Sequence, residues 1–501
     1  MMLAIESRDL VIKKMVYLYM TTYATTNPSL AQMCTNTLQK DCSHDDPMVR
    51  GLALRSLCSL NLPEMVEYIR EPLRRSLVDQ HAYVRKTGVI GILKLVHLEP
   101  AADVGVFKDQ LYEMLRDPDP MVVTNCIAVL NELMLASGGM AVNRPIMLHL
   151  LNRLGDFTEF GLGEVLGLLA RYTPADNDEI FSIMNLLDPV LRTSNSGSVL
   201  ATIKCFLHLT KNMPQLQPQI YGRIKPPLLT LIAGGIPELV YCLLKHVDFL
   251  VSTSPGSFDD EYRQFYVRYN DPSHVKYMKC QILAKLANTN NALDIISELS
   301  EYVSDIDGRL GKLAIKSIGE VACTSRCCAS PVAETVVEKL VELCSLDVGH
   351  VSAAAAATLR DVLRKHPNQR DVVAPVLCGC LKFIEDGDGK AAIIWMLGEV
   401  GEVVVEAPYV LEKTIANYDE HPSPVKLALL HASMKLFFKR PGEMQRILGN
   451  LITLATNDVA DQDLHDRALY YYRLLQTGPE NAERVINATA TTIDISKDFA
   501  E

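Results

Sequence analysis

The 501-residue sequence is poor in aromatic residues and contains no long apolar run. Phenylalanine, tryptophan and tyrosine together make up 6% of the chain, and Trp395 is the only tryptophan. Sheets favour β-branched and aromatic residues in alternating patterns, which are rare here, so the all-α class is favoured. No stretch reaches the roughly 18 apolar residues that suggest a membrane-spanning helix. Lys13 and Lys14 interrupt the apolar start, which argues against a signal peptide there.

The sequence also lacks the signatures of common enzyme and metal sites. It contains no P-loop, zinc-protease, serine-hydrolase or kinase motif. The 13 cysteines include no C-x-x-C pair, their tightest group being Cys323, Cys327 and Cys328. The glycines within 161–167 have the wrong spacing for a dinucleotide loop, so we interpret them as a helix–helix turn with a close contact. We therefore expect no catalysis, no metal and no cofactor, and we place Trp395 in an apolar core helix.

Excess positive charge is missing as well. With 49 basic and 60 acidic residues, the net charge of −11 argues against nucleic acid as a partner. Local basic groups remain, and each basic side chain near an anionic membrane surface contributes about 1 kcal/mol. The candidate membrane-facing residues are Lys13, Lys14, Arg74 and Arg75. The alternative is that these groups are only the solvated faces of helices.

The sequence does contain a recurring helix-start pattern. Asp46 is suited to accept hydrogen bonds at a helix N-terminus, and Pro47 suits the first helical position. From Val49 to Leu60 the apolar residues follow a 3.6-residue period, with Arg50 on the other face. Val84 lies 35 positions after Val49 in a similar segment. A period in the high thirties is typical of stacked helix pairs of the HEAT or armadillo type.

Further helix starts of this kind run along the chain. They lie at Asp119-Pro120, Asp271-Pro272 and Ser423-Pro424, with weaker ones at Asp307, Gly349, Asp388 and Asp463. The sequence therefore predicts an all-α HEAT/armadillo-like solenoid with roughly a dozen repeats. We expect this trunk to cover residues 1–478, followed by a polar, flexible tail over 479–501, without a hinge or an appendage domain.

Four sequence blocks within the predicted solenoid resemble the beta-adaptins, the large beta subunits of adaptor protein complexes. They are KKMVYLY at 13–19, YNDPSHVK at 269–276, IIWMLGE at 393–399 and DRALYYYRLL at 466–475. Within the family, residues 47–60, 143–146 with 149–153, and 407–412 resemble the beta subunit of the fourth, non-clathrin complex. Tyr472 stands where clathrin-type relatives tend to carry tryptophan.

The resemblance implies a non-catalytic trunk that holds a medium, a small and a second large subunit. It also implies peripheral attachment to the cytoplasmic side of membranes, recruitment by an Arf-type small GTPase, and sorting of cargo at the trans-Golgi network towards endosomes. The family's trunk begins with one or two helices before the segment at Lys13, so the first helices are expected to be missing here. The first helix would then expose an apolar face that needs a cap.

The resemblance also points to a small-GTPase contact on an early helix, residues 28–40. Gln32 and Thr35 stand where a clathrin-type relative has aliphatic residues. Either Met33, Asn36 and Gln39 rebuild the contact, or the second large subunit makes it. The alternative is that Gln32 and Thr35 are ordinary solvent-facing residues.

Three other scaffold classes share the solenoid architecture. A subunit of the COP-I-type coat is the main alternative. A nuclear transport receptor would have acidic inner helices and a longer array, and it would not contain the four blocks above. A phosphatase scaffold would have more regular repeats than these.

Overall fold

The computed structural model describes residues 4–99, 105–324, 326, 330–346, 348–382, 384–458 and 461–487. Helices and turns account for this part of the chain, and no strand occurs in it. The all-α solenoid prediction is confirmed. The chain divides into two compact units, Met1–Pro227 and Leu228–Glu501.

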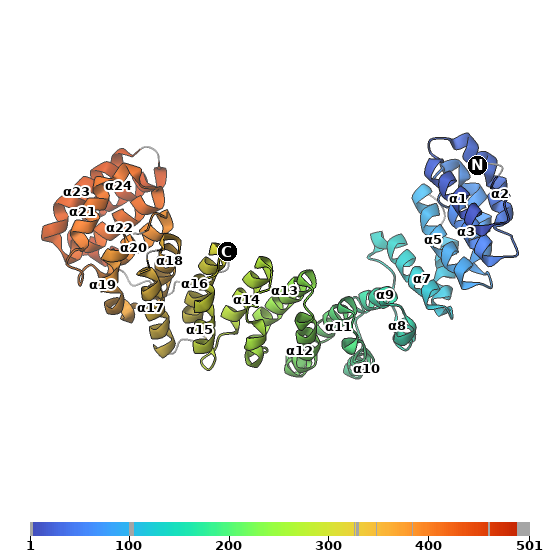
Figure 1. Ribbon diagram of the computed structural model, residues 1–501, viewed down its shortest axis with the longest axis horizontal. Coiled ribbons are helices and arrows are strands. Elements are labelled where there is room, and N and C mark those ends of the chain that lie inside the picture. The colour runs from blue at the N-terminus through green and yellow to red at the C-terminus, as the bar shows by residue number, and fades with distance from the viewer. Residues whose placement is uncertain are drawn as a thin grey trace. The chain divides into compact units, whose positions relative to one another are not determined.

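The first unit consists of helix pairs arranged in two layers (Figure 1). One layer stacks helices α3, α5, α7, α9 and α11 in chain order, and α1 packs on α3. The other layer includes α2, α4 and α6, which pack on α3, α5 and α7. The bounds are α1 (Leu10–Tyr23), α2 (Pro28–Asp41), α3 (Pro47–Leu57), η2 (Pro63–Met65), α4 (Val66–Leu77), α5 (Ala82–Leu98), α6 (Gly105–Glu113), α7 (Pro120–Leu133), α8 (Arg144–Leu151), α9 (Glu159–Leu169), α10 (Asn177–Leu187) and α11 (Ser196–Leu209).

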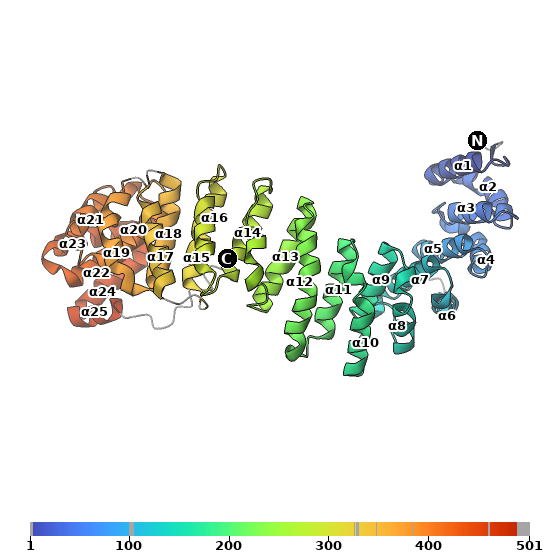
Figure 2. The ribbon, with the colours of Figure 1, turned by 60° about the horizontal axis from the view of Figure 1, so that its bottom comes forward.

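Helix α12 (Gln217–Ala233) carries the boundary between the units. In the second unit α14, α16, α18, α20 and α22 form one layer, whereas α15, α17 and α19 form another, as the turned view also shows (Figure 2). The bounds are α13 (Pro237–Thr253), η8 (Asp259–Phe265), α14 (Ser273–Leu286), α15 (Ala292–Tyr302), α16 (Gly308–Cys323), α17 (Ser330–Cys344), α18 (Gly349–Lys365), α19 (Arg370–Cys380), α20 (Gly387–Val400), α21 (Ala407–Ala416), α22 (Ser423–Lys439), α23 (Pro441–Asn457), α24 (Gln462–Gln476) and α25 (Pro479–Ile486).

The predicted helix starts at Asp46 and Asp119 have the expected capping geometry, whereas α14 begins at Ser273 and α22 at Ser423 without a side-chain cap. The Asp46 carboxylate accepts a hydrogen bond from the Met48 N–H at 2.8 Å, and Pro47 is the first helical residue of α3. Asp119 caps α7 by accepting from Met121 N at 2.9 Å. Both bonds satisfy amide groups that a helix leaves without an internal partner.

A basic residue near the start of several stacked helices ties one helix pair to the next. Arg50 Nε donates to Asp79 at 2.9 Å, and its Nη1 donates to the carbonyls of His44 and Asp45 at 2.8 Å. Arg85 repeats this arrangement with Asp117. In the second unit the equivalent ion pairs are Lys276–Asp305 at 2.9 Å and Lys426–Asp458 at 2.8 Å. Arg50 therefore does not lie on a purely solvent-facing side, as the helical pattern had suggested.

Helices α20 and α22 pack closely at Gly398. A Cβ added there would lie 2.6 Å from Ala432 Cα and 2.8 Å from Ala432 Cβ. We expect Gly398→Val to lower the free energy of unfolding by about 1–3 kcal/mol, because a packed helix contact must open. Urea unfolding monitored by circular dichroism measures the change in unfolding free energy. The matched control is Gly379→Val in α19, where a Cβ would meet nothing within 4 Å; an equal loss in both variants would contradict the packing argument.

Two sequence predictions need correction. Residues 161–167 lie inside α9 rather than in a turn, although Gly161 does make a close contact, since its Cβ would lie 2.5 Å from Thr124 Oγ1. The predicted tail from residue 479 is also wrong at its start, because Pro479–Ile486 forms α25. Ala482 and Ile486, one helical turn apart, are buried, and α25 packs on α22 and α24. Residues 488–501 and the cysteines at 327 and 328 lie outside the described residues.

Candidate interaction surfaces

Lys13 lies inside the α1–α2 contact and does not face a membrane. Its side chain is buried, with the residue only 6% exposed, and its ammonium pairs with the Asp41 carboxylate at the end of α2. The Tyr17 hydroxyl donates to the same Asp41 oxygen. Burial, and then the hydrogen bond to Asp41, raises the pKa of Tyr17. The prediction for Lys13 is wrong because its helical spacing to Val16 and Tyr17 places it on the packed face of α1.

The other predicted basic residues are exposed. Lys14 lies on the solvent-exposed side of α1, and Arg74 and Arg75 lie in the last turn of α4. Arg75 Nε donates to Glu71 Oε1 at 2.9 Å within the same helix. A membrane role for Lys14, Arg74 and Arg75 stays a prediction.

The five predicted small-GTPase contacts do not share one surface. Thr35 is 3% exposed, and its hydroxyl donates to Ala31 O at 3.1 Å and lies 3.3 Å from Met65 Sδ. It cannot touch a partner, so its assignment as a contact and as a solvent-facing residue is wrong. Gln32 donates to Glu64, and Gln39 Nε2 donates to Tyr68 O at 3.2 Å.

Two of the five predicted contacts remain exposed on α2 without such an anchoring role. Met33 is 67% exposed, and Asn36 lies one turn further along the same side. The exposed part of the predicted surface therefore centres on Met33 and Asn36, with Gln32 beside them.

Helix α1 also presents an exposed apolar stripe, as expected above for the first helix. Val11, Met15 and Leu18 are 62%, 60% and 61% exposed and follow helical spacing on one side of α1. Ile12 and Tyr19 are exposed next to them. A continuous exposed apolar stripe of this kind is typical of a protein contact. The sequence signal for this stripe is that the apolar residues of 10–20 occur on more than one side of the helix, so one packed face cannot bury them all.

Trp395 lies half-buried between charged side chains rather than in the core. The Arg364 guanidinium of α18 lies 4.9 Å from its ring centroid, and the Lys435 ammonium of α22 lies 5.8 Å from it. Lys435 also pairs with Glu399, one turn after Trp395 on α20. The cluster links α18, α20 and α22, neighbours in one layer, through cation–π and ionic contacts.

His431 of α22 lies beside this cluster and makes the stability of the fold depend on pH. Its Nδ1 lies 3.2 Å from the Tyr471 hydroxyl of α24. Burial, followed by the nearby Lys435, lowers the pKa of His431 to about 4, and the Glu399 carboxylate opposes this shift. The folded chain therefore holds the neutral imidazole at pH values where the unfolded chain, with an ordinary pKa near 6.5, binds a proton.

Stability is consequently expected to fall as the pH drops from about 6.5 towards 4, because only the unfolded state takes up this proton. We expect His431→Gln to remove about 2 kcal/mol of this loss between pH 7 and pH 4.5, allowing for partial solvent exposure. Urea unfolding of both proteins at the two pH values measures it. The prediction would be contradicted if the difference in unfolding free energy between the parent chain and the variant were the same at both pH values.

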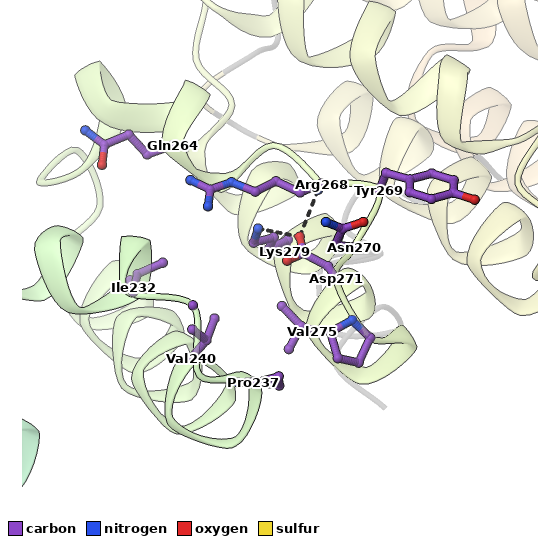
Figure 3. A pocket seen from close by; sticks show the side chains of 12 residues that line it. Ile232, Pro237, Val240, Gln264, Arg268, Tyr269, Asn270, Asp271, Val275 and Lys279 are labelled. Carbon is purple, nitrogen blue, oxygen red and sulfur yellow. Dashed lines mark hydrogen bonds and ion pairs between the residues drawn. The ribbon is translucent and has the colours of Figure 1, made fainter.

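The second unit contains a cavity of about 260 Å³ between α13, the end of α12 and the loop that joins η8 to α14 (Figure 3). Ile232, Val240 and Val275 line one side, while Arg268 and Lys279 lie on the other. Pockets for drug-sized ligands measure about 300–1,000 Å³, so the size suits a side chain better than a cofactor.

The described residues show neither a metal site nor a membrane span. Among them, no three His, Cys, Asp or Glu side chains gather where a metal ion could be held. The helices in the same part of the chain are all too short or too polar to cross a bilayer.

Stacked helix pairs with extended exposed faces define an α-solenoid scaffold, a class that usually works by offering surface. The chain belongs to the adaptin family: residues 3–479 match the family model described as the adaptin N-terminal region. Members of this family are non-catalytic scaffold subunits of adaptor complexes, in agreement with the sequence prediction.

Several curated relatives align over nearly the whole chain. Beta-adaptin-like protein A of Arabidopsis thaliana is 39% identical, covering 99% of this chain and 60% of the relative. AP-4 complex subunit beta-1 of Mus musculus is 40% identical, covering 95% and 64%. AP-1 complex subunit beta-1 of Homo sapiens is 34% identical, covering 99% and 52%. The chain thus spans less than two thirds of the length of these relatives.

A structural neighbour supports the fold. A chain of a homology model of the full-length AP-3 complex aligns with a TM-score of 0.59 at 19% identity, covering 94% of this chain and 85% of that one. At this identity the similarity establishes the solenoid architecture alone.

Proposed function

We propose that the chain is the trunk of the beta subunit of a heterotetrameric adaptor complex and acts as a scaffold in vesicle-mediated protein transport. The family match over residues 3–479 carries this proposal. The chain would hold a medium, a small and a second large subunit and would attach peripherally to the cytoplasmic side of membranes. The exposed apolar stripe of α1 supports a role in an assembly, since such faces are usually covered by a partner.

We further propose that the complex is of the fourth type and sorts cargo at the trans-Golgi network towards endosomes. The 40% identity to the mouse AP-4 subunit, against 34% to the human AP-1 subunit, supports this choice. Tyr472, which replaces the tryptophan expected in clathrin-type relatives, points the same way.

Reconstitution with defined partners tests both proposals. The chain is co-expressed with the second large, medium and small subunits of either the fourth or the first adaptor complex, and stoichiometry is measured by size-exclusion chromatography with light scattering. A 1:1:1:1 complex with the fourth set is expected. Assembly with the first set only would refute the subtype, and a chain that joins neither set would refute the adaptor proposal.

We propose that an Arf-type small GTPase, if this subunit contacts it, binds at Gln32, Met33, Asn36 and Gln39. Thr35 is excluded by its burial. Hydrogen exchange of the assembled complex, with the GTPase loaded with GTP or GDP, tests the surface. Protection of α2 with GTP alone is expected, whereas protection of the second large subunit alone would assign the contact there.

A further inference from the structure

We propose that the cavity beside α13 is a docking site for a short peptide of a partner protein, one with a branched aliphatic side chain close to a carboxylate. This inference concerns the second unit alone and does not depend on the type of adaptor complex. It rests on the shape, the charge and the fixed geometry of the cavity.

The apolar side of the cavity accepts a hydrocarbon group. Ile232 comes from the end of α12, Pro237 and Val240 from the first turn of α13, and Val275 from the first turn of α14. In Figure 3 Ile232, Pro237 and Val240 lie together across the opening from the loop residues. At about 260 Å³ the space holds one or two side chains, and burying a leucine or isoleucine there would remove apolar area from water.

The opposite side carries one uncompensated positive charge. Lys279 is almost fully buried, and its ammonium donates to Asp271 Oδ2 at 2.6 Å and to Tyr266 O at 3.2 Å. Asp271 therefore neutralises Lys279. Arg268 is exposed, and its guanidinium has no hydrogen bond or ion pair to any described residue. A single carboxylate on the ligand complements this arrangement, since an arginine fork binds carboxylates in a bidentate manner.

The loop that presents Arg268 is held in place before any ligand binds. Arg268 N donates to Asp271 Oδ2 at 2.8 Å, and Asp271 N donates back to Arg268 O at 3.1 Å. The Lys279–Asp271 pair then fastens this turn to α14, as the dashed lines in Figure 3 show. A pre-formed site avoids the entropy cost of ordering a loop on binding.

Tyr269 extends the site beyond the cavity. The residue is 95% exposed, and in Figure 3 its ring points away from the opening, next to Asn270. Exposed tyrosines beside a pocket are frequent anchors in protein interfaces. A peptide whose aliphatic side chain enters the cavity would continue across this ring. Nucleic acid fits poorly, because the single arginine lining this cavity, on a chain of net charge −11, offers too few phosphate contacts.

A peptide panel tests the proposal on the full chain. Fluorescein-labelled octapeptides of alanine and serine carry one leucine and one glutamate, one to four positions apart, and fluorescence anisotropy is measured at about 100 mM salt. At least one spacing is expected to bind with a dissociation constant below about 1 mM. Replacing its leucine by alanine should weaken binding at least tenfold.

A charge exchange separates recognition from folding. Arg268→Glu should weaken the best peptide at least tenfold, and exchanging the peptide's glutamate for lysine should restore binding to this variant. The matched control is Arg309→Glu, an exposed arginine at the start of α16 that does not line the cavity, and it should bind like the parent chain. The proposal would be overturned if Arg268→Glu left the affinity unchanged or if no peptide bound. It would also be overturned if the alanine–serine background peptide bound equally well. An Arg268-dependent dimer in light scattering would overturn it too and would assign the cavity to a second copy.

Discussion

Asp41→Ala is expected to unfold the α1–α2 end of the chain while leaving later helix pairs folded. The substitution removes the carboxylate that compensates the buried Lys13 ammonium and accepts the Tyr17 hydroxyl. Leaving one partner of a buried ion pair uncompensated costs about 3–5 kcal/mol. Because each pair in a solenoid contacts only its neighbours, this loss should stay local. Hydrogen-exchange mass spectrometry should show faster exchange in α1 and α2 with little change beyond α5.

Two further variants control this experiment. Lys14→Ala alters the neighbouring exposed lysine and should change stability by less than about 0.5 kcal/mol. The double variant Lys13→Met with Asp41→Leu replaces both charges by apolar side chains and should recover most of the loss. If Asp41→Ala exchanges like the parent chain, the buried pair does not hold α1 in place.

Arg85→Ala is the second large effect that we expect, because one side chain joins two helix pairs. The guanidinium binds both oxygens of Asp117 at 2.7 and 2.9 Å and donates to the carbonyls of Asp79 and Gln80 at 2.9 Å. Both charged partners are mostly buried. Removing Arg85 leaves the Asp117 carboxylate without its counter-charge, which should cost about 3–5 kcal/mol. Urea unfolding and exchange rates in α5 and α7 measure the loss.

Arg75→Ala provides the comparison for Arg85. Arg75 also pairs with a carboxylate, Glu71, but both side chains are largely exposed, so its removal should cost between 0 and about 1 kcal/mol. Similar losses for the two variants would show that the Arg85 contacts do not join the repeats more strongly than a surface pair. Because solenoids can unfold in stages, each variant is compared at the level of its own helices and not only by one midpoint.

Three of the incorrect sequence predictions share a cause. Lys13 was assigned to a membrane from a local basic group, Thr35 to a GTPase contact from the family resemblance, and Trp395 to the core from its apolar segment. Lys13 is buried because Asp41, 28 positions later, compensates it. Thr35 is covered by Met65, and Trp395 lies half-buried between Arg364 and Lys435. Each outcome depends on a residue from another helix, which no local pattern contains.

The capped helix starts at Asp46 and Asp119, the solenoid class and the family blocks were readable from the sequence alone. Capping and amphipathic spacing act within one or two turns, so Asp46, Pro47 and Val49 suffice to place the start of α3. Only the tertiary structure decided which surfaces are available, because this burial and charge compensation arise between residues that are 28 or more positions apart. The cavity that joins Ile232 of α12 to Arg268 and Lys279 is of this second kind, since three separate elements must pack before it exists.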